Sequence, residues 1–372
     1  FLGIPSLSGQ FTLEKNPGEG FPLVTAGHAV PICYESSDAE VVGVSARLLA
    51  ADIEAVTGHL PEVATSLPAR AARVLIAGTI GKSPVIETLI REGKIQAEAI
   101  RGTWERFSVS VVRNPFPGIG EALVIAGSDR RGTAYGLFSV SEAIGVSPWY
   151  WWADVPIKKS EEIRLRVSAS LSPETSVKYR GSFSNDEDWG VLRWASRTFD
   201  PELGNIGPRT YEKVYELLLR LKANYLCPAM HRRSMAFNEI AENKVLADRY
   251  GIVMGAVHCE PLLYSDAREW DEAVQGEWNY ETNRETILQV LGDRVRENAP
   301  YENIYTLALH GLHDKARDGS RRFGDRKAIL EEALDDQRES LAATIDRPLA
   351  EMPQAVTPSK AAMATHAKGR AL

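Results

Sequence analysis

Ionisable side chains recur where β-rich runs end in the second half of the chain. One run is followed by Asn185-Asp186-Glu187-Asp188-Trp189, and the next three end in Ala229-Met230-His231, Val257-His258-Cys259-Glu260-Pro261 and His310-Gly311-Leu312-His313-Asp314. Carboxylates and imidazoles are the groups that general acid–base catalysis uses. Each His alone could equally be a packed core residue, and three adjacent carboxylates often form only a solvated loop. Their recurrence after four successive runs favours a shared functional site.

An alternation of strands and helices would bring these groups together. Strands are predicted at Lys178–Phe183, Tyr225–Met230, Ile252–His258 and Ile304–His310, and helices at Tyr211–Lys222, Asn243–Tyr250, Arg284–Asn298 and Arg326–Thr344. This order is typical of a (β/α)8 barrel, whose catalytic residues lie at the carboxyl ends of its strands. A full barrel takes about 250 residues, so residues 173–358 have room for four units and at most a fifth strand at Pro353–Pro358. The sequence therefore predicts the first half of a TIM-type barrel, with an exposed parallel edge.

Residues 1–172 predict a separate N-terminal α/β sandwich domain. Strands are expected at Leu23–Val30, Arg73–Ala77, Phe107–Val112, Ala122–Ala126 and Ile163–Leu171. Helices are expected at Asp38–Thr57, where apolar residues recur with a period near 3.6, and from Arg131 to Ile144. The fold class is therefore α/β throughout. Residues 359–372 contain five Ala and no acid, so a disordered tail is predicted there and the chain is expected to be a C-terminally truncated piece.

Two glycine-containing turns invite a ligand-binding interpretation. Gly78-Thr79-Ile80-Gly81-Lys82-Ser83 resembles a phosphate loop, but Ile76 stands where such a loop requires its first Gly, so nucleotide binding is not expected. In Gly127–Gly132, Asp129 is expected to cap a helix. Trp149, Trp151 and Trp152 would suit stacking on sugar rings, although buried packing at a domain junction is the commoner role of such a cluster.

The composition of the chain argues against several classes of binding partner. The chain of 372 residues has 43 Lys and Arg against 50 Asp and Glu, a formal net charge of −7 without a basic cluster, which argues against nucleic acid. No apolar stretch is long enough for a membrane span. Three widely spaced cysteines give no C-x-x-C spacing, and no cofactor motif is present.

Seven long strings resemble glycoside hydrolase family 115, the xylan α-1,2-glucuronidases: GSDRRGTAYG, SEAIGVSPWYWWADVP, KYRGSFSNDEDWG, LRLKANYLCPAMH, DRYGIVMGAVHCEP, GEWNYETNR and ENAPYENIYTLALHG. This resemblance implies a secreted enzyme that removes (4-O-methyl)-glucuronic acid from glucuronoxylan or aldouronic-acid oligosaccharides with inversion, often as a homodimer. It implies no metal and no cofactor.

The resemblance also implies site residues. Asp186 and Asp314 would be catalytic, and the substrate-binding residues would be Glu142, Asp188, Trp189, His231, His258, Glu260 and His310. Two positions depart from the family: His310 stands where Arg is usual, and Ala361 stands where a P-Y-K-E string carries the Glu that resembles the general acid. Reduced activity is therefore expected.

Two other functions remain open at this point. A non-catalytic carbohydrate-binding protein would fit the Ala at position 361. A metal-dependent barrel hydrolase would use His231, His258, His310, His313 and Asp314, since His and Asp at strand ends also suit zinc.

Overall fold

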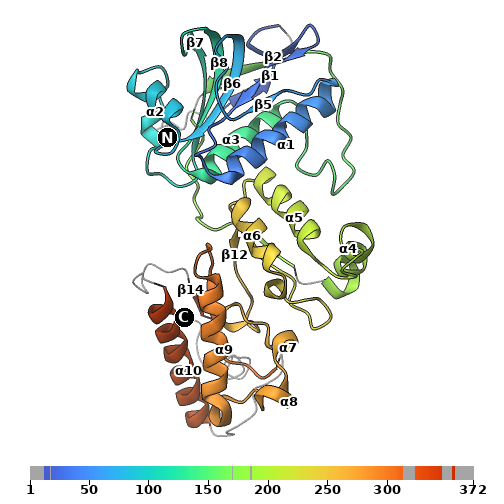
Figure 1. The fold of residues 1–372 in the computed structure, drawn as a ribbon, viewed down its shortest axis with the longest axis vertical. Helices are drawn as coiled ribbons and strands as arrows, with labels where there is room; N and C mark the ends of the chain where they lie inside the picture. Colours follow the sequence, from blue (N-terminus) through green and yellow to red (C-terminus); the bar gives the residue numbers. More distant parts are fainter. Residues whose placement is uncertain are drawn as a thin grey trace, which may run out of the picture. The chain divides into compact units, whose positions relative to one another are not determined.

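The chain folds into two compact units (Figure 1). The computed structural model describes residues 12–16, 18–169, 171–184, 187–312, 323–345 and 354–356. Unit 1 comprises Phe1–Arg180, Glu216–Asn224 and Arg249–Gly251, and unit 2 comprises Gly181–Tyr215, Tyr225–Asp248 and Ile252–Leu372.

Unit 1 contains a five-stranded sheet between helical layers. Its strand order is β5-β4-β6-β8-β7, with β4 at Ile32–Cys33, β5 at Val63–Ala64, β6 at Ala71–Thr79, β7 at Phe107–Arg113 and β8 at Ile119–Gly127. Only β7 runs antiparallel to its neighbour. In Figure 1, helices α1 (Glu40–Thr57) and α3 (Arg130–Ala143) lie side by side along this sheet, with α2 (Pro84–Arg91) apart from them. A short 3-10 helix, η1, spans Glu98–Ile100.

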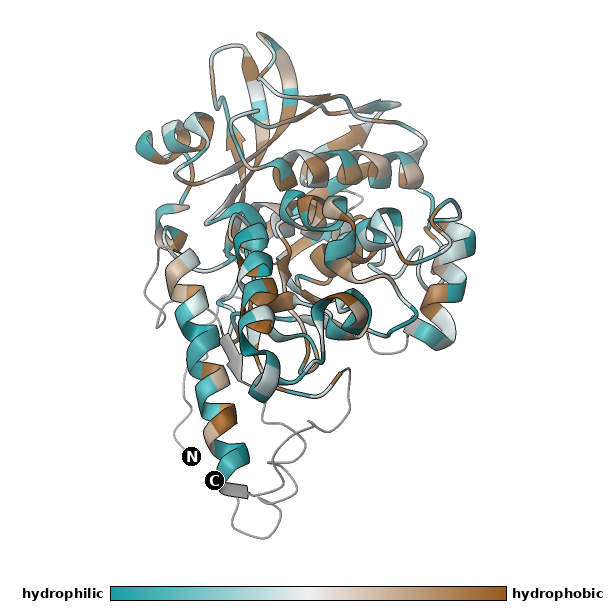
Figure 2. Ribbon diagram, turned by 60° about the horizontal axis from the view of Figure 1, so that its bottom comes forward, coloured by the Kyte–Doolittle hydropathy of each residue, from teal (hydrophilic) through white to brown (hydrophobic). Residues whose placement is uncertain are grey.

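From Val74 to Thr79 the central strand β6 is buried on both faces, as parallel strands in layered α/β folds are. Val74 and Ile76 pack in one core cluster with Ile86 and Leu89 of α2. Leu75 is fully buried and points to the opposite face, because side chains alternate along a strand. The strands are mostly hydrophobic in Figure 2, whereas the helices carry both hydrophobic and hydrophilic residues.

A second sheet in unit 1 corrects one prediction. It has the order β1-β9-β2-β3, with β1 at Thr12–Lys15, β2 at Phe21–Thr25, β3 at His28–Ala29 and β9 at Ile163–Ala169. The predicted single strand Leu23–Val30 is wrong, because the chain reverses at Ala26 and Gly27, which both have positive φ. Positive φ at both central residues is the geometry of a tight hairpin turn.

The helix ends of unit 1 follow the local sequence. Asp129 caps α3 as predicted, since its Oδ1 accepts hydrogen bonds from the backbone N–H of Arg131 at 3.0 Å and of Gly132 at 2.8 Å. Helix α2 was not predicted from the sequence; Ser83 caps it by accepting from the Ile86 N–H at 3.2 Å.

A fully buried carboxylate holds several segments of unit 1 together. Glu105 Oε1 accepts from Arg131 Nε at 2.6 Å and from Asn224 Nδ2 at 2.7 Å, while Oε2 accepts from Arg180 Nη2. Arg131 Nη1 in turn donates to the Gly251 carbonyl at 3.0 Å. Arg180, Asn224 and Gly251 each end a segment of unit 1, one or two residues before a strand of unit 2, so this network holds together the ends of those segments.

Unit 2 contains short parallel strands that follow one another in chain order. β10 (Gly181–Phe183), β11 (Tyr225–Cys227) and β12 (Val253–Met254) form one sheet, and β13 (Tyr305–Leu307) pairs with β14 (Gln354–Val356). A parallel bridge between Met254 and Asn303 links the two sets. The predicted strands are present but shorter, and β14 lies within the predicted fifth strand. Close approach of β10 to β11 requires Gly181, where a Cβ would lie 1.7 Å from the Tyr225 carbonyl oxygen.

Helices separate these strands. The predicted long helices appear as α5 (Pro208–Arg220), α6 (Ala241–Arg249), α9 (Tyr280–Asn298) and α10 (Phe323–Thr344). The sequence did not predict the short helices α4 (Leu192–Thr198), α7 (Asp266–Glu269) and α8 (Glu272–Gln275), a π-helix η2 (Glu187–Val191) or the 3-10 turns η3 (Phe237–Glu239) and η4 (Pro261–Leu263). Helices α9 and α10 pack with β13 through Leu291, Val295, Leu307, Ala333 and Leu341. Among the described residues, no helix is both long and apolar enough to cross a membrane.

Replacing Glu105 with Ala should lower the free energy of unfolding by about 3 to 5 kcal/mol, because the buried Arg131 loses its charge partner. Chemical denaturation followed by circular dichroism measures the change. Glu98→Ala removes a carboxylate from the exposed Glu98–Arg101 pair and should cost less than about 1 kcal/mol. Equal losses in both variants would contradict the role assigned to Glu105.

Candidate functional site

The candidate site lies in the segments that follow β10, β11, β12 and β13. Because these strands are parallel, their carboxyl ends lie at the same edge. Hydrogen bonds continue the ladder beyond the strands, from Ser184 N–H to the Cys227 carbonyl at 3.0 Å and from Gly255 N–H to the Leu226 carbonyl at 3.0 Å. The loops therefore leave the sheet from aligned positions.

The loops after β10 and β11 meet at Asp188. Its Oδ2 lies 3.8 Å from His231 Nδ1, and its Oδ1 lies 3.5 Å from Arg233 Nη1. The Asp188 side chain is 18% exposed, whereas those of His231 and Arg233 are 40% and 69% exposed. A carboxylate thus holds an imidazole and a guanidinium at the surface, and both of these can bind an anionic group of a ligand. The adjacent Trp189 is 82% exposed, which leaves its ring available for stacking.

The loops after β12 and β13 bring two imidazoles together. The rings of His258 and His310 lie 5.5 Å apart at an interplanar angle of 61°. His310 is buried, and its carbonyl oxygen accepts a hydrogen bond from Trp278 Nε1 at 3.1 Å. A sulfur contact of 3.4 Å between Cys259 Sγ and Met230 Sδ links the loop after β12 to the loop after β11.

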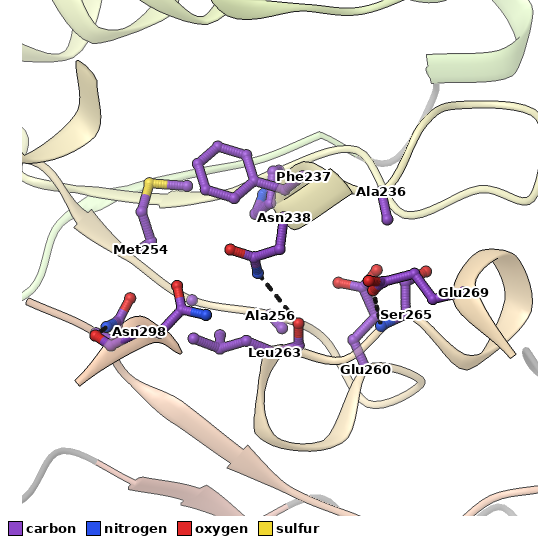
Figure 3. Close-up of a pocket in the computed structure, with 13 residues that line it drawn as sticks. Ala236, Phe237, Asn238, Met254, Ala256, Glu260, Leu263, Ser265, Glu269 and Asn298 are labelled. Carbon is purple, nitrogen blue, oxygen red and sulfur yellow. Dashed lines mark hydrogen bonds between the residues drawn. The ribbon is translucent and has the colours of Figure 1, made fainter. Parts of the chain in front are cut away.

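Glu260 is buried beside a small internal cavity (Figure 3). The cavity holds about 10 Å³, room for about one water molecule. Asn238 Nδ2 donates to the Leu263 carbonyl at 3.2 Å across this region, and Glu269 accepts from the Ser265 N–H at 3.0 Å. Burial raises the pKa of Glu269, and the nearby Arg294 opposes this shift. The cavity is too small for a sugar, so these groups pack the base of the loops.

Helix α10 positions the backbone that carries His310. The side-chain amide of Gln337 is buried and bridges Ala308 twice: Oε1 accepts from the Ala308 N–H at 3.0 Å, and Nε2 donates to its carbonyl at 2.7 Å. Thr306 Oγ1 donates to the Ala256 carbonyl at 2.8 Å and ties β13 to the segment after β12. These bonds fix the chain two residues before His310.

The structure brings some of the predicted site residues together. Asp188 meets His231 and His258 meets His310, whereas Glu260 is buried next to the small cavity. Glu142 belongs to unit 1, is 61% exposed on α3 and pairs with Lys222 Nζ at 2.9 Å. Asp186, His313, Asp314 and Ala361 lie outside the described residues. The roles assigned to all these residues stay predictions.

Sequence reasoning missed Arg233 and Gln337. The run Met230-His231-Arg232-Arg233 contained a signal for the first, since two cations follow a strand-end His. Gln337 gave no signal, because a polar residue in a helix says nothing about a distant backbone. Within the described part of the chain, no three His, Cys, Asp or Glu side chains are grouped closely enough to hold a metal ion.

Comparison with known proteins places the chain among the glycosyl hydrolases. The model of glycosyl hydrolase family 115 matches residues 172–372. The structure is similar to that of BtGH115A, a family GH115 4-O-methyl-α-glucuronidase with specificity for decorated arabinogalactans, with 37% identity and a TM-score of 0.78. That match covers 90% of this chain and 42% of that one, so this chain spans less than half the length of that relative. The chain belongs to glycosyl hydrolase family 115.

Two further solved structures are more distant. A GH20 β-N-acetylhexosaminidase from Streptomyces coelicolor A3(2) is 10% identical, with a TM-score of 0.49 over 93% of this chain and 68% of that chain. CpGH84D is 11% identical, with a TM-score of 0.46 over 90% and 47%. These values are too low to bear on function. A search of the curated proteins found no match.

Replacing Gln337 with Leu should destabilise the protein by about 1 to 3 kcal/mol, because the buried N–H and carbonyl of Ala308 lose their partner. The imidazole resonances of His310 should also shift in NMR spectra, because the backbone leading to it is released. Glu339→Leu places the same side chain at an exposed position of α10 and should change stability by no more than about 0.5 kcal/mol. Unchanged His310 resonances in Gln337→Leu would contradict this positioning role.

Proposed function

We propose that this chain takes part in the removal of (4-O-methyl)-glucuronic acid side chains from a plant polysaccharide. The similarity to a 4-O-methyl-α-glucuronidase, 37% identical over 90% of the chain, carries this proposal. The strand-end groups support it, because a uronic acid presents both a carboxylate for cations and hydroxyls for carboxylates and imidazoles. The strands in unit 2 would be the first part of a (β/α)8 barrel spanning residues 173–358, after an N-terminal domain of residues 1–172.

Arg233 and His231 are the proposed partners of the uronic-acid carboxylate. Both are accessible at the strand-end edge, and Asp188 holds them from one side. Arg233 provides a permanent charge with several N–H donors. This role matters more in this chain than in relatives that carry Arg at the position of His310.

Hydrolysis with inversion requires two carboxyl groups about 6.5 to 9.5 Å apart, one to protonate the leaving oxygen and one to activate water. Asp186 and Asp314 are the proposed catalytic residues, while Glu142, Asp188, Trp189, His258, Glu260 and His310 would bind or position the substrate. The position that matches the family acid is Ala361. Slow hydrolysis with retained binding would follow.

Glucuronoxylan and aldouronic-acid oligosaccharides are the proposed substrates, by the resemblance of the seven strings. The specificity of BtGH115A for decorated arabinogalactans makes a second candidate of that polysaccharide class. A binding protein without turnover is the remaining alternative. Secretion and assembly as a homodimer are further proposals that rest on the family.

Replacing Arg233 with Ala should weaken binding of an aldouronic-acid oligosaccharide on the order of 10-fold, because a charge-assisted hydrogen bond to the uronic-acid carboxylate is lost. Isothermal titration calorimetry measures the affinity. Arg209→Ala is the matched control, since Arg209 is 64% exposed and pairs with Glu202 in the same unit. A neutral xylo-oligosaccharide should bind both variants like the original chain. Equal affinity of Arg233→Ala for the acidic oligosaccharide would refute the assignment.

Release of 4-O-methylglucuronic acid from glucuronoxylan should be about 10² to 10⁴ times slower than with a family member that carries the Glu, because general acid catalysis contributes about that factor. Ala361→Glu should recover part of the rate, whereas Ala362→Glu, its neighbour, should not. Rates are measured by chromatography of the released uronic acid. If the unchanged chain turned over substrate as fast as family members that carry the Glu, the hypothesis that it lacks the general acid at position 361 would be wrong. Binding without any turnover in all variants would favour the carbohydrate-binding alternative.

A further inference from the structure

A second cavity lies in unit 1, formed entirely by residues of that unit and sharing none with the strand-end site. Its volume is about 250 Å³. It is lined by the end of β4, by the segments that follow β4 and β5, by β6 and by the start of α2, with Cys33, Glu35, Ser66, Ile76 and Val85 among the lining residues. This volume is below the range of about 300 to 1,000 Å³ found for drug-sized ligands, so a smaller molecule fits it.

The position of the cavity is set by the topology of the sheet. From β4 the chain passes through α1 to β5 on one side, and from β6 it passes through α2 towards β7 on the other side. The carboxyl ends of β4 and β6 therefore flank a point where the connections diverge. In open α/β sheets, ligands bind in the crevice that forms at such a point.

The Glu35 carboxylate in the lining repels an anionic ligand. The backbone N–H groups that a phosphate would use are already occupied by carboxylates of the chain itself: Thr79 N–H donates to Asp38 at 2.7 Å, Gly81 N–H to Glu87 at 2.7 Å and Val85 N–H to Glu35 at 3.1 Å. Among the described residues, no Lys or Arg lines the cavity. In the loop Gly78–Ser83, carboxylates of the chain itself thus take the place that a phosphate would occupy.

The remaining groups suit a molecule that is rich in hydroxyls. Glu35 Oε2 accepts from Ser83 Oγ and the Val85 N–H, while Oε1 has no donor among the residues that the structure describes. Thr65 and Ser66 add exposed hydroxyls that bond to none of the described residues. These groups can pair with the hydroxyls of a small ligand in the cavity.

The cavity also has apolar lining residues. They are Leu67, Ile76, Ala77 and Val85, together with the buried Cys33. Burial raises the pKa of the Cys33 thiol to about 11, so it stays neutral. Tyr34 is held against α1 at Gly43, where a Cβ would lie 2.6 Å from the Tyr34 hydroxyl oxygen. The lining thus offers apolar side chains for the C–H face of a sugar ring and polar groups for its hydroxyls.

We infer that this cavity binds a neutral monosaccharide, or one neutral sugar residue of a glycan, with Glu35 accepting hydrogen bonds from its hydroxyls and Leu67, Ile76 and Val85 contacting its apolar face. The inference does not depend on the proposed function. It gives the N-terminal domain a binding role of its own.

The test is titration of the full chain with D-xylose, L-arabinose and D-galactose, observed by saturation-transfer NMR and calorimetry. At least one of them should bind with a dissociation constant on the order of 1 mM. Ser66→Trp, which fills the mouth of the cavity from an exposed position, should abolish this binding without changing the Tm. Leu60→Trp adds the same ring at an exposed position outside the cavity and should leave the binding intact.

Three outcomes would overturn the inference. The first is the absence of binding of all three sugars, and the second is binding that persists in Ser66→Trp. The third is binding of glucosamine but of no neutral sugar, because that would identify a cation site around Glu35. Arg233→Ala should weaken binding of the aldouronic-acid oligosaccharide by the same factor in the Ser66→Trp background as in the original chain, so failure here is separable from failure of the strand-end site.

Discussion

The buried carboxylate of Glu105 is the constraint on which the packing of unit 1 depends. It accepts hydrogen bonds from Arg131, Arg180 and the Asn224 amide, and the backbone of Glu105 has a positive φ. A charge that is fully removed from water is tolerated only when its partners are complete. Arg180 and Asn224 directly precede β10 and β11 in the sequence, so this requirement holds the ends of the unit 1 segments that lead into those strands. The loops that carry the ionisable groups then leave from the other ends of those strands.

At the strand ends of unit 2, buried side chains hold the backbone that carries the candidate site residues. Gln337 and Thr306 satisfy the backbone around β13, and Trp278 binds the carbonyl of His310. None of these three side chains needs to touch a ligand. Their hydrogen bonds restrict the imidazole of His310 to one neighbourhood, beside His258, and that restriction is what a binding or catalytic group requires.

Much of the fold follows from periodicity and turn chemistry. The apolar period near 3.6 in α1, the Asp129 cap of α3 and the long helices of unit 2 all match the prediction within a few residues. The strand Leu23–Val30 does not, because the turn at Ala26 and Gly27 lacks the Asn-Gly or Asp-Gly pair that marks such hairpins. The strands of unit 2 are shorter than predicted, since the β-rich sequence continues into loops that add only single hydrogen bonds to the ladder, such as the one from the Gly255 N–H to the Leu226 carbonyl.

The sequence by itself determined the α/β class, the succession of strands and helices, and the ionisable residues after each strand, because these depend on residues close together in the chain. Tertiary structure alone decided that Asp188 holds His231 and Arg233, that Gln337 supports Ala308, and that the phosphate-like loop after β6 is filled by Glu35, Asp38 and Glu87. All of those contacts join residues that are 29 to 50 positions apart in the sequence, except the contact of Glu87 with Gly81, which are 6 positions apart. Local pattern carries no information about such pairs, since they form only after packing has fixed both partners.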